Sequence, residues 1–300
     1  MSLKPYFQLI RLPNLFTAAA DSLAGWLLVR GTLDQPGKWL PLCAASMAIY
    51  AAGIALNDLF DYEIDRKERP NRPLPSGRVS RKFAAGFGVA GLVAGLILAA
   101  CVSVPSLIVA AALIACVLLY DGGIKRTVLG PEIMGACRGL NLLLGLSVAA
   151  DFGGPSAWLA AGSLAVFVIG LTWISRSEVE TGQSRGVTAG MIVQNVALVG
   201  LFVVAFRART FPGTGGERPI VPVEGLLVLA VVALIVNSAV GRAVVDPSPK
   251  TIQTAVKTGV LSLVWLDVGL VAAVRGPGPA LAVAALWVPA FVLGKWLYST

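Results

Sequence analysis

The chain contains 300 residues, of which 56% are hydrophobic and only 13% are charged. Soluble globular domains carry about 25% charged residues, so this composition excludes an ordinary soluble fold. The chain has no histidine, which excludes histidine metal ligands and histidine general bases. Its formal net charge of +8 is spread over short loops beside apolar blocks, as membrane topology requires, so we predict no nucleic-acid partner.

Long apolar blocks predict membrane-spanning helices. No charged side chain lies between Lys82 and Asp121, and none lies between Asp151 and Arg176. A span needs about 20 apolar residues, so the first block holds nearly two spans, with a turn at residues 103–106. The runs lack the alternation of membrane strands. We therefore predict an all-α multi-pass membrane protein, a single unit over residues 1–300, with nine or ten helices at 12–30, 39–57, 83–101, 104–120, 130–150, 155–175, 188–206, 222–241, 254–274 and 279–298.

The basic residues predict the orientation of these helices. Lys and Arg are enriched in cytoplasmic loops. The segment 66–82, the pair Lys125 and Arg126, and Arg176 would all lie on one side of the bilayer. We expect this side, with the N-terminus, to face the cytoplasm from the inner membrane. Residues 1–11 are too polar for a signal peptide, so the first span is expected to stay in the protein.

An acidic cluster follows the second predicted span, where residues 57–65 read NDLFDYEID. In a continued helix Asn57, Asp61 and Asp65 would share one face, with Asp58 beside them. Stacked carboxylates at a helix C-terminus repel one another and become favourable with a bound cation, and oxygen-only ligands suit Mg²⁺. The alternative is a solvated loop whose acids pair with Arg66, Lys67 and Arg69, as we expect for Glu63 and Glu68. For Asn57, Asp61 and Asp65 we favour the metal site.

A proline-rich loop comes next, with residues 69–80 reading RPNRPLPSGRVS. The prolines forbid a helix, Gly77 predicts a turn, and Ser80 is a good N-cap for the third span. Arg72 and Arg78 could clamp a phosphate. For Arg78, a simple topology charge explains the sequence equally well.

These residues resemble the UbiA superfamily of membrane prenyltransferases. The pattern N-D-x-x-D-x-x-x-D at 57–65, followed by R-P-L-P-S-G at 72–77, is similar to its first aspartate-rich motif and trailing loop. R-L-P-N at 11–14 and Y-D-x-x-x-K at 120–125 resemble the family too. The resemblance implies a helical bundle around a central cavity, open sideways to lipid. Mg²⁺ and basic residues would hold a prenyl diphosphate there, and a small, aromatic or other acceptor would take the prenyl group.

The resemblance also implies roles for individual residues. Asp58, Asp61 and Asp65 would be the catalytic acids, and the metal would be held by Asn57, Asp61, Asp65 and Glu178. The diphosphate would be bound by Arg72, Lys125, Arg138 and Arg185.

The second aspartate-rich motif of the family departs from its pattern in this chain. Its three acids fall on Ser175, Glu178 and Gly182, so only Glu178 keeps a carboxylate, with Glu180 as a substitute. In this altered second motif the chain resembles a UbiA-like branch named EboC. It leaves open a second class of function, a carrier or isoprenoid-binding protein that has lost the reaction. An unrelated transporter is a third alternative, which the specific first motif disfavours.

Asp21, Arg138 and Asp267 lie well inside predicted spans. Each would cost about 2.5–3.5 kcal/mol at the centre of a lipid-facing helix, so each must face a cavity, find a partner or lie near an interface. Asn141 lies one turn after Arg138 and extends its polar face. Either Asp21 and Arg138 form a structural pair, or Arg138 faces the cavity and contacts a ligand.

Overall fold

The computed structural model describes residues 3–177, 184–213 and 222–298, and these ranges form helices without any strand. The helices are α1 (Lys4–Leu9), α2 (Leu12–Arg30), α3 (Pro36–Phe60), α4 (Tyr62–Glu68), α5 (Arg81–Ala100), α6 (Val104–Asp121), α7 (Gly130–Leu146), α8 (Pro155–Arg176), α9 (Ser184–Phe206), α10 (Val223–Val245), α11 (Pro249–Arg275), α12 (Pro277–Ala285) and α13 (Trp287–Tyr298).

The predicted all-α multi-pass fold is confirmed. In the described ranges nine candidate spans are long and apolar enough to cross a membrane, and α7, with 17 residues, packs among them. Two predicted spans differ in detail. The span at 130–150 ends early, at Leu146, and Asp151 and Phe152 then adopt positive φ angles that no continuing helix allows. The last span is divided into α12 and α13, because Pro289 cannot donate the hydrogen bond that would join them.

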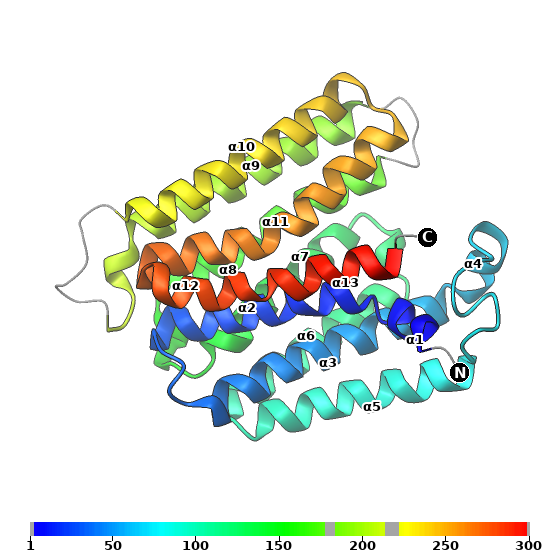
Figure 1. Ribbon diagram of the computed structural model, residues 1–300, viewed down its shortest axis with the longest axis horizontal. Helices are drawn as coiled ribbons and strands as arrows, with labels where there is room; N and C mark the ends of the chain where they lie inside the picture. Colours follow the sequence, from blue (N-terminus) through cyan, green and yellow to red (C-terminus); the bar gives the residue numbers. More distant parts are fainter. Residues whose placement is uncertain (1–2, 178–183, 214–221, 299–300) are drawn as a thin grey trace.

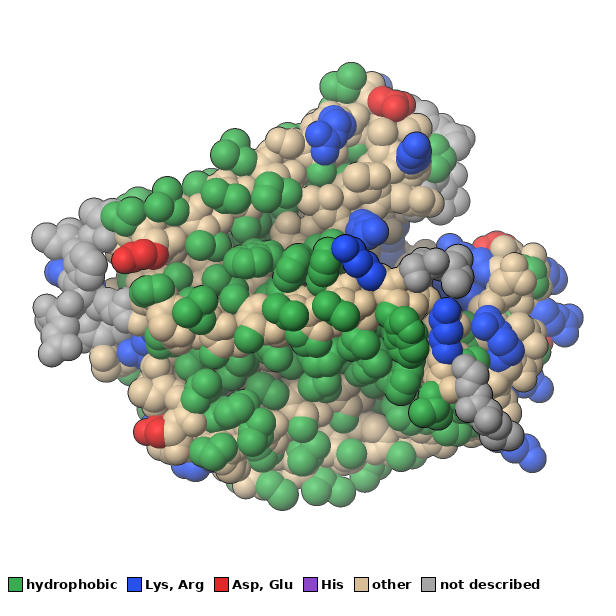
Figure 2. Space-filling model, in the orientation of Figure 1, with side chains coloured by type: hydrophobic (Ala, Val, Ile, Leu, Met, Phe, Trp, Pro, Cys, Tyr) green, Lys and Arg blue, Asp and Glu red, His purple; other side chains and the backbone are tan. Residues whose placement is uncertain are grey.

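The helices lie side by side along the long axis of the molecule (Figure 1). The central helix is α2, with 83% of its apolar window buried, whereas α5 at one edge has 22% buried. Large apolar side chains are exposed on the outer helices, including Val93, Ile108, Ile192 and Leu234. Figure 2 shows this apolar surface between the two ends, and basic side chains gathered at the end that carries α4. Such a surface is suited to lipid, because exposed apolar area of this extent is rare on soluble monomers.

The crossing of α2 and α7 depends on two glycines. A Cβ at Gly25 would overlap the carbonyl oxygen of Leu142, and a Cβ at Gly145 would overlap that of Ser22. Small residues allow the two backbones to approach closely, as in other membrane helix pairs. The contact places the polar side chains of α7 against α2 in the middle of the bundle.

Local sequence signals position the loops at the ends of the spans. Ser80 caps α5 by accepting a hydrogen bond from the Phe83 amide at 3.1 Å, and Gly77 adopts a φ of 73° in the preceding turn. Ser103 caps α6 in the same way, through the Ser106 amide. The Ser80 cap, the turn at Gly77 and the turn at residues 103–106 were predicted; the cap formed by Ser103 was not. The acidic segment differs, because α3 ends at Phe60 and α4 begins at Tyr62, with Asp61 in the turn between them.

Candidate active site

A hollow runs from the α4 end of the bundle into its interior. Its inner part, about 360 Å³, is mostly apolar and is lined by α2, α3, α6, α7, α8 and α11. Its outer part, also about 360 Å³, reaches the polar ends of α3 and α6. The two parts share six lining residues and therefore form one cavity; these residues are Arg11, Tyr50, Val117, Tyr120, Met134 and Cys137.

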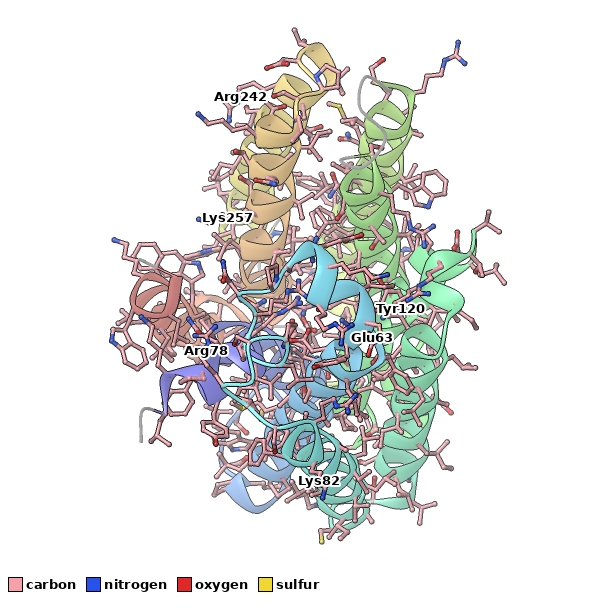
Figure 3. The ribbon with its side chains drawn as sticks, turned by 90° about the vertical axis from the view of Figure 1, so that its right-hand side faces the viewer. Glu63, Arg78, Lys82, Tyr120, Arg242 and Lys257 are labelled. Carbon is pink, nitrogen blue, oxygen red and sulfur yellow. The ribbon has the colours of Figure 1, made fainter. Side chains whose placement is uncertain are left out.

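Figure 3 looks at this end of the bundle. Arg78 and Lys82 lie on the side of the loop that follows α4, and Tyr120 lies across the bundle from them, near the end of α6. Arg242 and Lys257 are farther away, on α10 and α11. The polar mouth of the cavity is formed by the ends of α3 and α6 and by the loop that follows α6.

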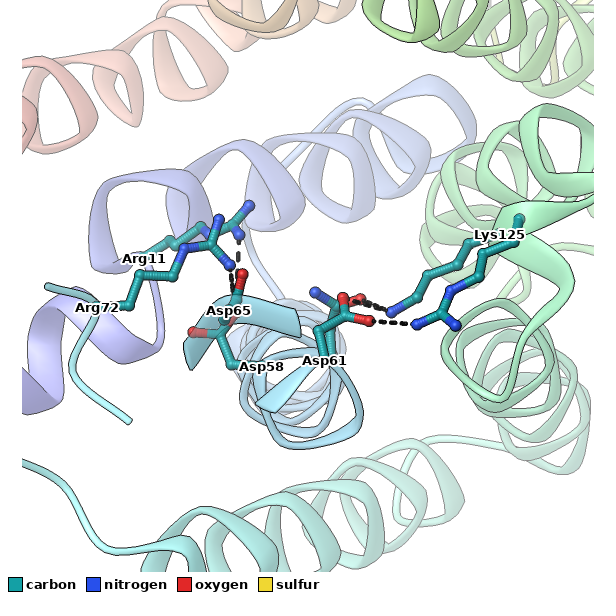
Figure 4. Close-up of polar contacts among 8 residues, drawn as sticks. Arg11, Asp58, Asp61, Asp65, Arg72 and Lys125 are labelled. Atoms are coloured by element: carbon teal, nitrogen blue, oxygen red, sulfur yellow. Dashed lines mark hydrogen bonds and ion pairs between the residues drawn. The ribbon is translucent and has the colours of Figure 1, made fainter. Parts of the chain in front are cut away.

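Asn57 and Asp61 form one half of the acidic cluster. Lys125 donates to Asn57 Oδ1 and to Asp61 Oδ2, both at 2.7 Å. Arg126 donates to Asp61 Oδ1 at 3.2 Å. The end of α8 supports this loop, since Arg176 donates to the carbonyl oxygen of Lys125 at 2.6 Å. The structure therefore brings three predicted site residues together across the cavity mouth (Figure 4).

Asp58 and Asp65 form the other half, on the opposite side of the same helices (Figure 4). Arg72 lies 2.6 Å from Asp65 Oδ2 and 3.5 Å from Asp58 Oδ1, and Arg11 lies 3.9 Å from Asp58 Oδ1. The predicted common face of Asn57, Asp61 and Asp65 is thus wrong. Residues seven apart stay within about 20° of each other around a helix, whereas residues eight apart diverge by about 80°. Asp65 therefore lies on the same side as Asp58, and both carboxylates face Arg72.

A second, strongly basic pocket of about 530 Å³ lies on this side of α3. Arg69 and Arg72 line it, together with Arg11 and Arg78. Arg78 is held within its own loop, where it donates to Ser76 Oγ at 2.9 Å and to the carbonyl oxygen of Asn71. The pocket can attract an anion, although its arginines are partly neutralised by Asp58.

Three site residues received no role from the sequence. Asp121 is 7% exposed and lines the cavity mouth beside Lys125, and Arg126 contacts Asp61. Arg11 lines both pockets from the junction of α1 and α2, where its φ is 46°. A non-glycine residue in this region is strained, and such strain concentrates at functional sites. The signal for Arg11 and Asp121 was their place in the short motifs 11–14 and 120–125.

The oxygen atoms at the mouth fit a hard divalent cation. Asn57 and Asp61 already converge on one cation, the Lys125 ammonium. Carboxylate and amide oxygens are suitable Mg²⁺ ligands, and Mg²⁺ usually takes only one or two carboxylates beside substrate phosphates. Within the described ranges, no three carboxylates or thiols converge into a complete metal site. A metal bound to Asn57 and Asp61 would leave positions for oxygens of the substrate.

The other predicted residues lie elsewhere. Arg138 lies deeper in the cavity, where it pairs with Asp21 at 2.6 Å and lines the wall, so the predicted pair is present and a ligand role stays a prediction. The structure does not bring it to Lys125. Arg185 is exposed at the start of α9 and is not among the residues that line the cavity. Glu178 and Glu180 lie outside the described residues.

Several curated proteins are similar to this chain. It is 37% identical over 123 residues to the digeranylgeranylglyceryl phosphate synthase of Sulfolobus acidocaldarius, covering 40% of this chain and 43% of the relative. It is 32% identical over 158 residues to the synthase of the same name from Methanopyrus kandleri, covering 52% and 57%. The chain thus spans about half the length of the curated relatives it matches.

Solved structures share the fold over most of the chain. A digeranylgeranylglyceryl phosphate synthase structure has a TM-score of 0.65 at 22% identity, covering 91% of this chain and 99% of that one. A UbiA homolog from Archaeoglobus fulgidus bound to GPP and Mg²⁺ has a TM-score of 0.57 at 14% identity, covering 89% and 99%. At these identities the likeness shows the fold alone. The model of the UbiA prenyltransferase family, however, matches residues 18–244, from α2 to α10, and the chain therefore belongs to this family.

Proposed function

We propose that the protein is a membrane-embedded prenyltransferase, which transfers an isoprenoid group from a prenyl diphosphate to a small acceptor. The observation that carries this proposal is the single cavity. Its mouth holds Asn57, Asp61 and Lys125, and its interior is a mostly apolar chamber between the helices. A prenyl diphosphate has the matching form, with a charged head and a hydrocarbon tail.

The mouth residues would bind the charged head. Asn57 and Asp61 would hold Mg²⁺ together with substrate oxygens, with Glu178 as a ligand proposed from the sequence. Asp58 and Asp65 would support the cluster from the opposite side of the same helices. When bound, Mg²⁺ would supply charge neutralisation for the leaving diphosphate. Lys125 and Arg72 would bind diphosphate oxygens once released from their carboxylates, and the sequence adds Arg185. This reaction needs no histidine, in agreement with the composition.

The chamber would position the reacting atoms and exclude water. The bond between the prenyl carbon and the diphosphate oxygen breaks, the diphosphate leaves, and the acceptor atom bonds to the same carbon with loss of its proton. Apolar side chains such as Ile49, Leu113 and Val168 line the chamber. They would hold the prenyl tail and keep water from capturing the allylic cation.

A carrier without catalysis is the second candidate. Its support is the sequence of the second motif, where Ser175 and Gly182 replace two acids of the family pattern. A protein with one acidic cluster could bind a prenyl diphosphate and still fail to ionise it. The acceptor is also a matter of proposal. The matched relatives are named for a glyceryl phosphate product, and an aromatic acceptor rests only on the family resemblance.

We further propose that the cavity mouth faces the cytoplasm. The mouth loops carry a dense set of basic residues, which is the pattern of cytoplasmic loops. These residues are Arg66, Lys67, Arg69, Arg72, Arg78, Arg81, Lys82, Lys125, Arg126 and Arg176.

The direct test uses purified protein with Mg²⁺, labelled geranyl diphosphate and a total lipid extract as the source of acceptor. We expect Mg²⁺-dependent release of diphosphate together with a labelled, less polar product, and loss of both on addition of a chelator. Binding of geranyl diphosphate without release would favour the carrier. Absence of both binding and release would contradict the proposed substrate class.

A further inference from the structure

A polar cluster lies at the floor of the cavity, far from its mouth. Arg138 and Asn141 project from α7 and Ser46 from α3, and all three line the inner chamber. Ser46 precedes Asn57 by eleven residues in the same helix. At 1.5 Å per residue, the cluster therefore lies about 16 Å below the level of Asn57, near the middle of the span.

The charge of Arg138 is balanced within this cluster. Arg138 lies 2.6 Å from Asp21 Oδ1, as an ion pair without the alignment of a hydrogen bond, and Asn141 donates to Asp21 Oδ2 at 2.9 Å. The carboxyl group of Asp267 is fully buried within hydrogen-bond reach of Asp21, yet neither of its oxygens has a donor. The cluster therefore holds one basic and two acidic side chains, and no excess of basic groups.

Arg138 has donors that the cluster leaves unused. Its Nε is buried without a hydrogen-bond partner, and of its two terminal nitrogens only Nη2 makes a hydrogen bond, to the carbonyl oxygen of Thr17 at 3.2 Å. The residue lines the cavity, so its Nη1 can meet an oxygen there. Asn141 donates to Ala18 and Asp21, and Ser46 donates to Ala18 or Asn141. Arginine only donates hydrogen bonds, so its vacant position calls for an oxygen acceptor. A buried donor left unpaired costs about 1–3 kcal/mol.

The prenyl donor cannot supply that oxygen. Its oxygens are all in the diphosphate, which belongs at the mouth, and its tail is hydrocarbon. An anionic group would also be unfavourable at this depth, because Asp21 already balances the charge of Arg138 and the buried Asp267 adds a second carboxyl group. We propose that Arg138 binds an uncharged oxygen, a hydroxyl or carbonyl, of the acceptor molecule. This assignment rests on the proposed function, because it presumes that an acceptor shares the chamber with the prenyl chain.

The test compares three probes of one shape: 2-naphthol, 2-naphthoate and naphthalene. Their binding to the protein in nanodiscs is measured by equilibrium dialysis, with empty nanodiscs subtracted. A hydrogen bond from a charged donor predicts that 2-naphthol binds about tenfold or more tightly than either of the other two. Equal binding of naphthol and naphthalene, as expected if Arg138 meets only water, would overturn the proposal. So would tighter binding of naphthoate.

Two variants locate the effect. Asp21→Asn combined with Arg138→Gln removes both charges together, and should reduce 2-naphthol binding to the level of naphthalene while leaving the binding of inorganic diphosphate with Mg²⁺ unchanged. Lys125→Gln is the matched control and should show the opposite pattern. Undiminished binding of 2-naphthol by the double variant would overturn the proposal. If that variant does not fold, the comparison of the three probes on the wild-type protein is the test of the proposal. A wild-type protein that prefers 2-naphthol but releases no diphosphate from geranyl diphosphate would retain the oxygen site and refute the proposed function.

Discussion

At the scale of single residues, the cavity mouth is organised around Asp61. Its two oxygens accept hydrogen bonds from Lys125 and Arg126, and Asn57 shares the Lys125 ammonium. The side chain of Asp61 is 20% exposed, so substrate can reach it. A small divalent cation on the same oxygens would release both basic side chains toward a diphosphate. In the proposed reaction, Asp61 would therefore couple metal binding to diphosphate binding.

We predict that Asp61→Asn lowers Mg²⁺-dependent release of diphosphate by about 100-fold or more. The substitution keeps the shape of the side chain but removes the charge that holds the cation, and changes even in the outer shell of metal sites typically cost about 10–100-fold. The measurement is diphosphate release at several Mg²⁺ concentrations.

The matched control is Glu63→Gln, on the exposed side of α4, where Glu63 pairs only with Arg66 at 3.6 Å. Exposed ion pairs contribute little, so its activity should stay within about twofold of wild type. Equal losses in both variants would show that negative charge near the mouth, and not ligation by Asp61, supports the activity.

The identity of most mouth residues was predictable, but their partners were not. The spacing of Asn57, Asp58, Asp61 and Asp65 marked the cluster, and the pairing of Glu63 with Arg66 is confirmed. The division into two halves follows from helical spacing, because Asp65 lies seven residues after Asp58 but eight after Asn57. The break of the helix after Phe60 has no signal in the sequence. The contact of Lys125 with Asp61 spans 64 positions and follows from the helix layout.

At the scale of helices, the ends of the helices were easier to predict than the contacts between them. Ser80 and Ser103 cap their helices by local chemistry that can be read from neighbouring residues. The close crossing of α2 and α7 could not be read in this way, because the need for glycine at position 145 arises from the Ser22 carbonyl on another helix. This crossing fixes the depth at which Arg138 and Asn141 enter the cavity.

We predict that Gly145→Ala destabilises the protein by about 1–3 kcal/mol, since the added methyl group forces two packed backbones apart. The measurement is thermal unfolding in detergent. Gly162→Ala on α8 is the control, because a Cβ there meets open space. In that helix interior alanine should stabilise by about 0.5–1 kcal/mol. A stabilising Gly145→Ala would mean that α2 and α7 do not cross closely.

At the scale of the whole molecule, the helix layout and the charge distribution agree. Counting α7, and counting α12 with α13 once, the described part of the chain forms ten crossings, an even number that returns the C-terminus to the side of the N-terminus. Figure 1 shows both termini at the α4 end. The basic loops gather at this end, and the apolar surface lies between the ends (Figure 2). The site thus lies where a water-soluble diphosphate head can enter while its tail stays in the bilayer.

This arrangement makes a prediction about the two ends of α5. The helix begins at Arg81, beside the α4 end, and its far end leads into Cys101, whose side chain is exposed. A thiol at position 67, introduced as Lys67→Cys together with Cys101→Ser, would lie on exposed α4. In intact bacterial cells a membrane-impermeant maleimide should label native Cys101 and leave the thiol at position 67 unlabelled until the membrane is opened. The Cys101→Ser protein without Lys67→Cys is the control and should stay unlabelled, because Cys43 is buried and Cys116 and Cys137 lie within the bundle.

Labelling of both positions from one side would contradict the crossing of α5. Reversed labelling would keep the bundle and place the cavity mouth outside the cell, against the enrichment of basic residues in cytoplasmic loops.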